Sequence, residues 1–137
     1  MRKRFRQNVS SGAPWEDQVG YSRAVRIGHT VEVSGTTATL HGEIQHPGNA
    51  YLQTRVALDI IRAALEAAGA RLEDVVRTRM YVTDISQWED VGRAHGEYFA
   101  AVKPAATMVE VSRLIHDDLV VEIEVTAVCK PETDEWI

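Results

Sequence analysis

Residues 104–114 read PAATMVEVSRL and residues 119–128 read LVVEIEVTAV. Both stretches are rich in β-branched residues, which is typical of strands, and a short polar segment joins them. Because side chains alternate along a strand, the second stretch places its residues on two different faces. One face carries Leu119, Val121, Ile123, Val125 and Ala127, and the other carries Val120, Glu122, Glu124 and Thr126. This pattern predicts a sheet with one apolar face and one face that bears carboxylates. Alternating glutamates are equally typical of a solvated surface.

The N-terminal residues 1–19 show no period, and the Gly12-Ala13-Pro14 run interrupts any regular element. We therefore expect an extended segment that runs over the protein surface. Trp15 is an exception within this polar lead. Such a side chain either docks on the protein body or a neighbouring subunit, or lines a ligand cleft.

The rest of the chain predicts two helices among further strands, from apolar residues at three- and four-residue spacings and from runs of alternating residues. The first expected elements are a hairpin over 21–35 with its turn at Gly28-His29 and a loop over 36–48, with or without one short strand. They are followed by a helix over 50–68 that ends at Gly69, a strand over 75–83, a helix from a capping box at Ser86–Glu89 to about Val102, and the two strands quoted above. Helices with one apolar face need a sheet to cover them, so the order predicts an α+β sandwich. The apolar residues Val109, Val111 and Val120 suggest that the sheet face without helices is also partly buried. Self-association of the protein would bury it.

Composition limits the class of protein. A chain of 137 residues with 45% hydrophobic residues fits one domain with a real core. The net charge of -5 disfavours nucleic acid and anionic membranes as partners. A single cysteine, Cys129, and the absence of a long apolar run or signal-peptide pattern indicate a cytoplasmic protein without membrane association.

Few residues suggest chemistry by spacing alone. The five histidines lack any metal-ligand spacing, so we expect no metal and no cofactor. His95 falls on the apolar stripe of the second helix, which favours a hydrogen-bonded core histidine over a catalytic base. Glu110 and Glu122, expected on neighbouring strands of a partly buried face, are candidates for acid–base work with raised pKa values.

Taken together, these segments resemble the RidA family, also called YjgF or L-PSP proteins. The resemblance covers residues 20 to 128 and rests on Gly20-Tyr21, Val33-Ser34-Gly35, Arg79–Asp84, Glu97-Tyr98-Phe99, Pro104-Ala105, Val109-Glu110-Val111 and Val121–Glu124. It implies a single RidA-like domain over 20–137 with a chorismate-mutase-like fold, in which one mixed β-sheet has two helices packed on one face. It also implies a homotrimer with a central β-barrel and ligand clefts at the subunit boundaries.

The resemblance also implies a function, the cofactor-free hydrolysis of reactive imines and enamines. Glu122 matches the family glutamate that positions or activates water, and Tyr21 matches the cleft tyrosine. Ser34 and Gly35 match the backbone contact. The family arginine that clamps the substrate carboxylate is replaced here by Ala106, which places deamination of 2-aminoacrylate in doubt. Arg79 and Arg113 are possible replacements.

Two classes of function remain open at this level. One is a hydrolase of imines or related small metabolites, with Met108 and Trp15 as added apolar wall of the substrate site. The other is a trimer that binds or senses a metabolite without turnover. The older endoribonuclease label of the family is disfavoured by the acidic net charge.

Overall fold

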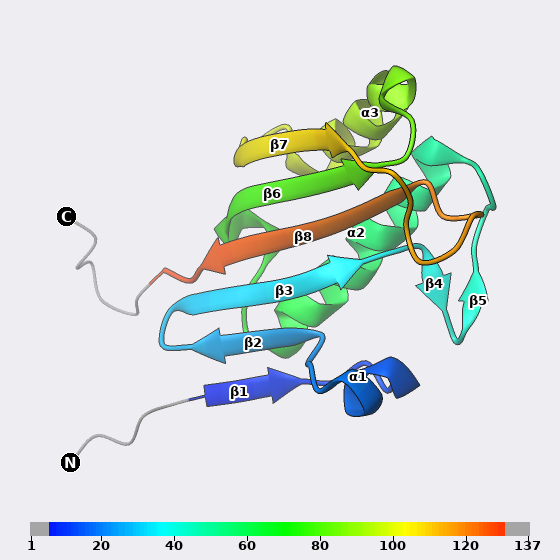
Figure 1. Ribbon diagram of the computed structural model, residues 1–137. Coiled ribbons are helices and arrows are strands. Elements are labelled where there is room, and N and C mark those ends of the chain that lie inside the picture. The colour runs from blue at the N-terminus through cyan, green and yellow to red at the C-terminus, as the bar shows by residue number, and fades with distance from the viewer. Residues whose placement is uncertain (1–5, 131–137) are drawn as a thin grey trace, which may run out of the picture.

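The computed structural model, which describes residues 6–130, has one six-stranded sheet with two long helices on a single face (Figure 1). In spatial order the strands are β1 (Arg6–Val9), β2 (Ala24–Ile27), β3 (Thr30–Thr36), β8 (Val121–Val128), β6 (Val75–Val82) and β7 (Ala105–Glu110). β6 and β7 pair in parallel, whereas the other neighbouring strands pair antiparallel. The mixed sheet with helices on one face confirms the predicted α+β fold.

The helices are α1 (Pro14–Val19), α2 (Ala50–Ala67) and α3 (Trp88–Phe99), with short 3-10 turns η1 (Leu72–Asp74) and η2 (Ile85–Gln87). α2 and α3 cover the sheet, while α1 lies near β1 at the sheet edge (Figure 1). A second, two-stranded sheet joins β4 (Thr39–Leu40) to β5 (Glu43–Ile44). Within the described residues, no helix combines the length and apolarity needed to cross a membrane.

The core forms where the apolar face of β8 meets α2. Val121, Ile123, Val125 and Ala127 are all buried, in strict alternation with half-buried residues. The facing side of α2 is equally buried and contributes Ala57, Leu58, Ile61, Ala64 and Leu65. The alternation predicted for this strand and the helical period predicted for residues 50–68 are therefore both confirmed.

The N-terminal prediction was wrong within the described residues. Residues 6–9 form β1, which pairs with β2, and residues 14–19 form α1. Pro14 does not interrupt a helix here, because it occupies the first helical turn, where its missing N–H is no loss. Residues 6–19 are thus an integral part of the fold.

The predicted start of α3, the second of the two helices expected from the sequence, was also wrong in detail. The Asp84 side chain accepts hydrogen bonds from the Ser86 backbone N–H at 3.0 Å and from its hydroxyl at 2.6 Å. Asp84 therefore caps the η2 turn, and Ser86 does not cap α3. The helix ends at Phe99, before the predicted Val102.

His95 lies between α3 and the sheet, as expected for a core histidine. Its Nε2 lies 2.9 Å from the Thr78 hydroxyl, and its ring packs against Phe99 with ring centroids 4.7 Å apart. Burial lowers the pKa of His95, because the charged imidazolium loses its hydration inside the protein.

This burial predicts a pH-dependent stability. The unfolded chain binds a proton at His95 below a pH of about 6.5, whereas the folded state resists protonation until a lower pH. The free energy of unfolding should therefore fall as the pH drops below about 6.5. Urea denaturation at several pH values should show a weaker acid loss in His95→Gln than in wild type. His29→Gln is the control. If it weakened the acid loss of stability as much as His95→Gln does, the assignment of this loss to His95 would be wrong.

Candidate functional site

A cavity of about 520 Å³ opens at one end of the sheet. Its walls come from α1, the end of β3, the β4–β5 hairpin and the segment that leads into β8, and the last two lie at the same end of the sheet (Figure 1). A volume of this size suits a small organic molecule. The part of the cavity where β3 and β8 pair, here called its floor, carries Gly35, Thr36 and Glu122.

Glu122 lies against the backbone of β3 at this floor. The register between β3 and β8 shifts between Val33 and Thr36, and Gly35 falls within this irregularity. A Cβ atom added at Gly35 would overlap the Glu122 carboxylate. The absence of a side chain at Gly35 therefore allows the carboxylate to lie directly over the strand.

The environment of Glu122 favours its protonated form. Burial raises the pKa of this carboxyl, the positive charge of Arg23 opposes the rise, and the negative charge of Glu124 adds to it. A carboxyl with a raised pKa exchanges protons closer to neutral pH than an exposed one. Glu122 thus has the properties of a general acid or base.

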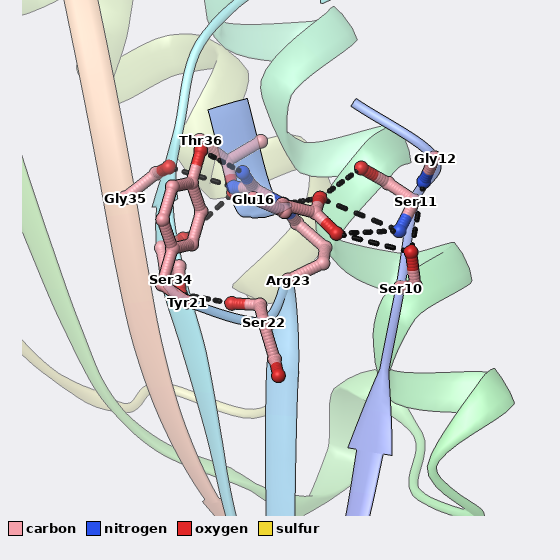
Figure 2. A network of polar contacts seen from close by, with 10 residues as sticks. All are labelled: Ser10, Ser11, Gly12, Glu16, Tyr21, Ser22, Arg23, Ser34, Gly35 and Thr36. Carbon is pink, nitrogen blue, oxygen red and sulfur yellow. Dashed lines mark hydrogen bonds and ion pairs between the residues drawn. The ribbon is translucent and has the colours of Figure 1, made fainter. Parts of the chain in front are cut away.

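Arg23 is the arginine that lines the cavity within residues 6–130, and no sequence motif indicated it. Its Nη1 donates to the Gly35 carbonyl at 2.7 Å and to the Thr36 hydroxyl at 3.0 Å. Its Nη2 lies 3.4 Å from the Tyr21 hydroxyl, and the guanidinium carbon lies 5.6 Å from the centre of the Tyr21 ring (Figure 2). Strand alternation, which places residues 21 and 23 on the same side, was the available signal.

Glu16 holds α1 beside this group. Its side chain is only 5% exposed, and one carboxylate oxygen lies 3.8 Å from Nε of Arg23. The hydroxyls of Ser10 and Ser11 and the Ser11 backbone N–H donate to the same carboxylate (Figure 2). Burial alone raises the pKa of Glu16, but these hydrogen bonds and Arg23 outweigh it, so that the net shift is downward. Glu16 is therefore a carboxylate at neutral pH and fixes α1 to the sheet.

The mouth of the cavity is apolar. Its large apolar side chains include Trp15, Val19, Leu40, Ile44, Ile60 and Ile115. Trp15 is 52% exposed, and Val19 and Ile115 are about equally solvent-accessible at 71% and 70%. Exposed apolar side chains that gather in one place mark a binding surface for a ligand or another protein chain.

Gln53 of α2 holds two cavity loops in place. Its buried amide donates to the carbonyls of Gln45 at 3.2 Å, His46 at 3.1 Å and Asp118 at 2.8 Å. Its carbonyl accepts from the Val120 N–H at 2.9 Å. The loop after β5 and the loop before β8 are thus joined through one side chain, which no sequence motif indicated.

The structure brings together four of the predicted site residues. Tyr21, Gly35, Glu122 and Trp15 all line the cavity. Ser34 precedes Gly35 in the chain but does not line the cavity within the described residues. Its hydroxyl instead donates to the Ser22 carbonyl at 2.6 Å.

Ala106 and Met108 lie elsewhere in the single chain. Both are on β7, which β6 separates from β8, and Met108 packs against the core. Neither of the suggested replacement arginines lines the cavity within residues 6–130, and Arg79 instead lies 3.6 Å from Glu124.

The prediction for Glu110 was wrong, because β7 does not neighbour β8 in the sheet. Glu110 instead accepts a hydrogen bond from the Ile85 N–H at 2.9 Å, and β6 lies between it and Glu122. The two strands are consecutive in sequence, but β6 inserts between them. The order of the strands in the sequence therefore led to the wrong prediction that Glu110 and Glu122 lie on neighbouring strands.

Comparison with known proteins identifies the family. The model of the family described as endoribonuclease L-PSP matches residues 13–129. The chain is 38% identical over 121 residues to an uncharacterised protein of Streptomyces coelicolor, covering 88% of this chain and 90% of that protein. It is also 38% identical over 114 residues to a RutC family protein of Pyrococcus horikoshii, covering 78% and 85% of the two chains.

Solved structures agree with these matches. A member of the YjgF/YER057c/UK114 family from Mycobacterium tuberculosis shares 51% identity and a TM-score of 0.83, covering 90% of this chain and 99% of that one. The YjgF gene product of E. coli shares 30% identity and a TM-score of 0.77, covering 90% and 94%. The chain therefore belongs to the YjgF/RidA family, also named L-PSP and RutC.

Proposed function

We propose that this protein is a cofactor-free hydrolase of imines or enamines. The observation that carries the proposal is the half-buried carboxyl of Glu122, which lies over the Gly35 backbone at the floor of a cavity of about 520 Å³. Tyr21 and Arg23 add hydrogen-bond donors beside it. This arrangement supplies a proton-transfer group and polar contacts for one end of a small molecule.

The chemistry needs water and one proton-transfer group. The substrate enters as the protonated imine, and Glu122 as a carboxylate takes a proton from water while the water oxygen bonds to the carbon of the C=N group, whose π electrons move to nitrogen. The protonated Glu122 then gives its proton to the nitrogen, the C–N bond breaks, and the new hydroxyl releases its proton to solvent as the C=O bond forms. The products are a carbonyl compound and ammonia or an amine. An enamine enters this sequence after a proton adds to its carbon to form the imine.

A homotrimer is part of the proposal. The resemblance to RidA proteins implies clefts at subunit boundaries, where β7 of a neighbouring subunit would bring Ala106 and Met108 toward the cavity. The open sheet face supports an assembly, because Val76 and Val109 are exposed there at 48% and 42%. Light scattering at micromolar concentration should give three times the chain mass of 15.3 kDa.

A second candidate is a metabolite-binding trimer without turnover. The replacement of the expected carboxylate-binding arginine by Ala106 favours it, because a charge-assisted contact contributes about 1.5–3 kcal/mol that alanine does not supply. The endoribonuclease activity in the name of the family model has less support. The net charge of -5 disfavours attraction to RNA.

The experiment that separates these candidates measures keto acid and ammonia release from freshly generated imines. The substrates are 2-aminoacrylate and several bulkier imines, tested with wild type and with Ala106→Arg. Turnover of any imine by wild type, faster than its spontaneous hydrolysis, supports the hydrolase. Turnover by Ala106→Arg alone would show that the natural protein does not deaminate, and would favour the binding trimer.

Gly35→Ala tests the contact at the cavity floor. The new Cβ must displace the Glu122 carboxylate from the β3 backbone, so we expect a loss of kcat/KM of about tenfold or more with a smaller loss of stability. Steady-state kinetics and thermal unfolding measure the two effects. Gly96→Ala is the control, because a Cβ there meets no neighbour within 4 Å. Equal kinetics for both variants would contradict the role given to this contact.

A further inference from the structure

We propose that Arg23 binds the carboxylate of the ligand, and that the remainder of the ligand is a branched or aromatic apolar group. This inference rests on the proposed function, since it names the class of molecule that the same cavity accepts. Arg23, which directly precedes β2, would make the contact to the anion that Ala106 does not provide.

The hydrogen bonds of Arg23 leave one side of its guanidinium available. Nη1 has two N–H groups, and these are directed to the Gly35 carbonyl and the Thr36 hydroxyl. Nη2 also has two, and among residues 6–130 its acceptor is the Tyr21 hydroxyl at the long distance of 3.4 Å. Because the guanidinium is planar and one nitrogen is anchored, the position of Nη2 in the cavity wall is fixed. An arginine held in this way suits a carboxylate.

The charges around Arg23 permit an anion to bind. Glu16 on α1 lies 3.8 Å from Nε and is the fixed counter-charge. Glu122 on β8 is a second acidic group near Arg23, and burial favours its neutral form. A bound carboxylate would favour that neutral form further, since two anions close together repel. Hydrolysis of a bound ligand then requires a pH at which Glu122 has lost this proton and can act as the base.

The apolar wall determines the rest of the ligand. Trp15, Leu40 and Ile115 are exposed side chains of the cavity lining, and Ile44 and Ile60 are half-buried ones. The cavity volume of about 520 Å³ exceeds what a three-carbon molecule fills. A branched or aromatic group would cover this apolar surface, whereas a small ligand would leave it in water.

Binding of unreactive probes tests the inference independently of turnover. Isothermal titration would compare 3-phenylpropanoate, its amide 3-phenylpropanamide, and the short acid propanoate. In wild type we expect 3-phenylpropanoate to bind at least about tenfold more tightly than its amide. In Arg23→Gln the two affinities should agree within about twofold, while Arg62→Gln on α2, which is paired with Asp59, should behave as wild type. In Trp15→Ala, 3-phenylpropanoate should lose more affinity than propanoate.

The outcomes separate this inference from the hydrolase proposal. Equal affinity of wild type for the acid and the amide would overturn the inference, even if imines are hydrolysed. An equal loss for both probes in Arg23→Gln would also overturn it. A clear preference for the acid that Arg23→Gln removes would support it, even if no imine is turned over. If Arg23→Gln does not fold, the comparison of acid with amide on wild type decides.

Discussion

Glu122→Gln is expected to lower kcat for imine hydrolysis by about a hundredfold or more, because the amide neither accepts the proton of water nor returns it to nitrogen. Glutamine keeps the size of the side chain, so its position against Gly35 and the fold should be retained. The measurement is the steady-state rate of keto acid and ammonia release.

Glu124→Gln is the matched control. Glu124 lies on the same face of β8, two residues away, and its carboxylate accepts a hydrogen bond from the Tyr81 hydroxyl at 2.8 Å. It does not line the cavity within the described residues. If Glu124→Gln lost as much kcat as Glu122→Gln, the rate would depend on the charge of the sheet face. Specific proton transfer at Glu122 would then be excluded.

The pH dependence gives a second test of the same residue. Because the pKa of Glu122 is raised, its carboxylate form disappears at a higher pH than that of an ordinary glutamate as the solution is acidified. The reaction needs the carboxylate to accept a proton from water, so kcat/KM should fall on the acid side through this raised pKa. The residual activity of Glu122→Gln should lack that acid limb.

Gln53→Leu is expected to reduce the free energy of unfolding by about 2–4 kcal/mol, since it removes every hydrogen bond that this buried side chain makes to two loops. The hydrogen bonds lost are those to the carbonyls of Gln45, His46 and Asp118 and from the N–H of Val120. Leucine fills a similar volume, so the loss reflects hydrogen bonds more than packing. Urea denaturation measures the change.

Local measurements would identify the cause of this loss. Amide exchange at Val120 should become faster in Gln53→Leu, because its N–H loses the acceptor, and the cavity loops should become more accessible to protease. Gln18→Leu on the exposed side of α1 is the control and should change stability by less than about 0.5 kcal/mol. Unchanged exchange at Val120 would contradict the role given to Gln53.

The candidate site was only partly predictable. Tyr21, Gly35, Glu122 and Trp15 were identified from the sequence and lie together at the cavity. Arg23 and Gln53 were missed, since neither belongs to a motif and each acts through partners that are distant in the chain. The contributions of Ala106 and Met108 depend on a neighbouring subunit and stay predictions.

The sequence by itself determined the two long helices, the five main strands that follow residue 20, and the family of this protein. The alternation in β8 and the helical period in α2 are local patterns, because the side-chain direction at each residue follows from its own secondary structure. Tertiary structure decided which elements meet. β6 lies between the consecutive strands β7 and β8, and α1 brings Glu16 to Arg23. Such contacts depend on strand order, register and helix docking, which local patterns leave open. The chemistry of the cavity floor arises from those contacts.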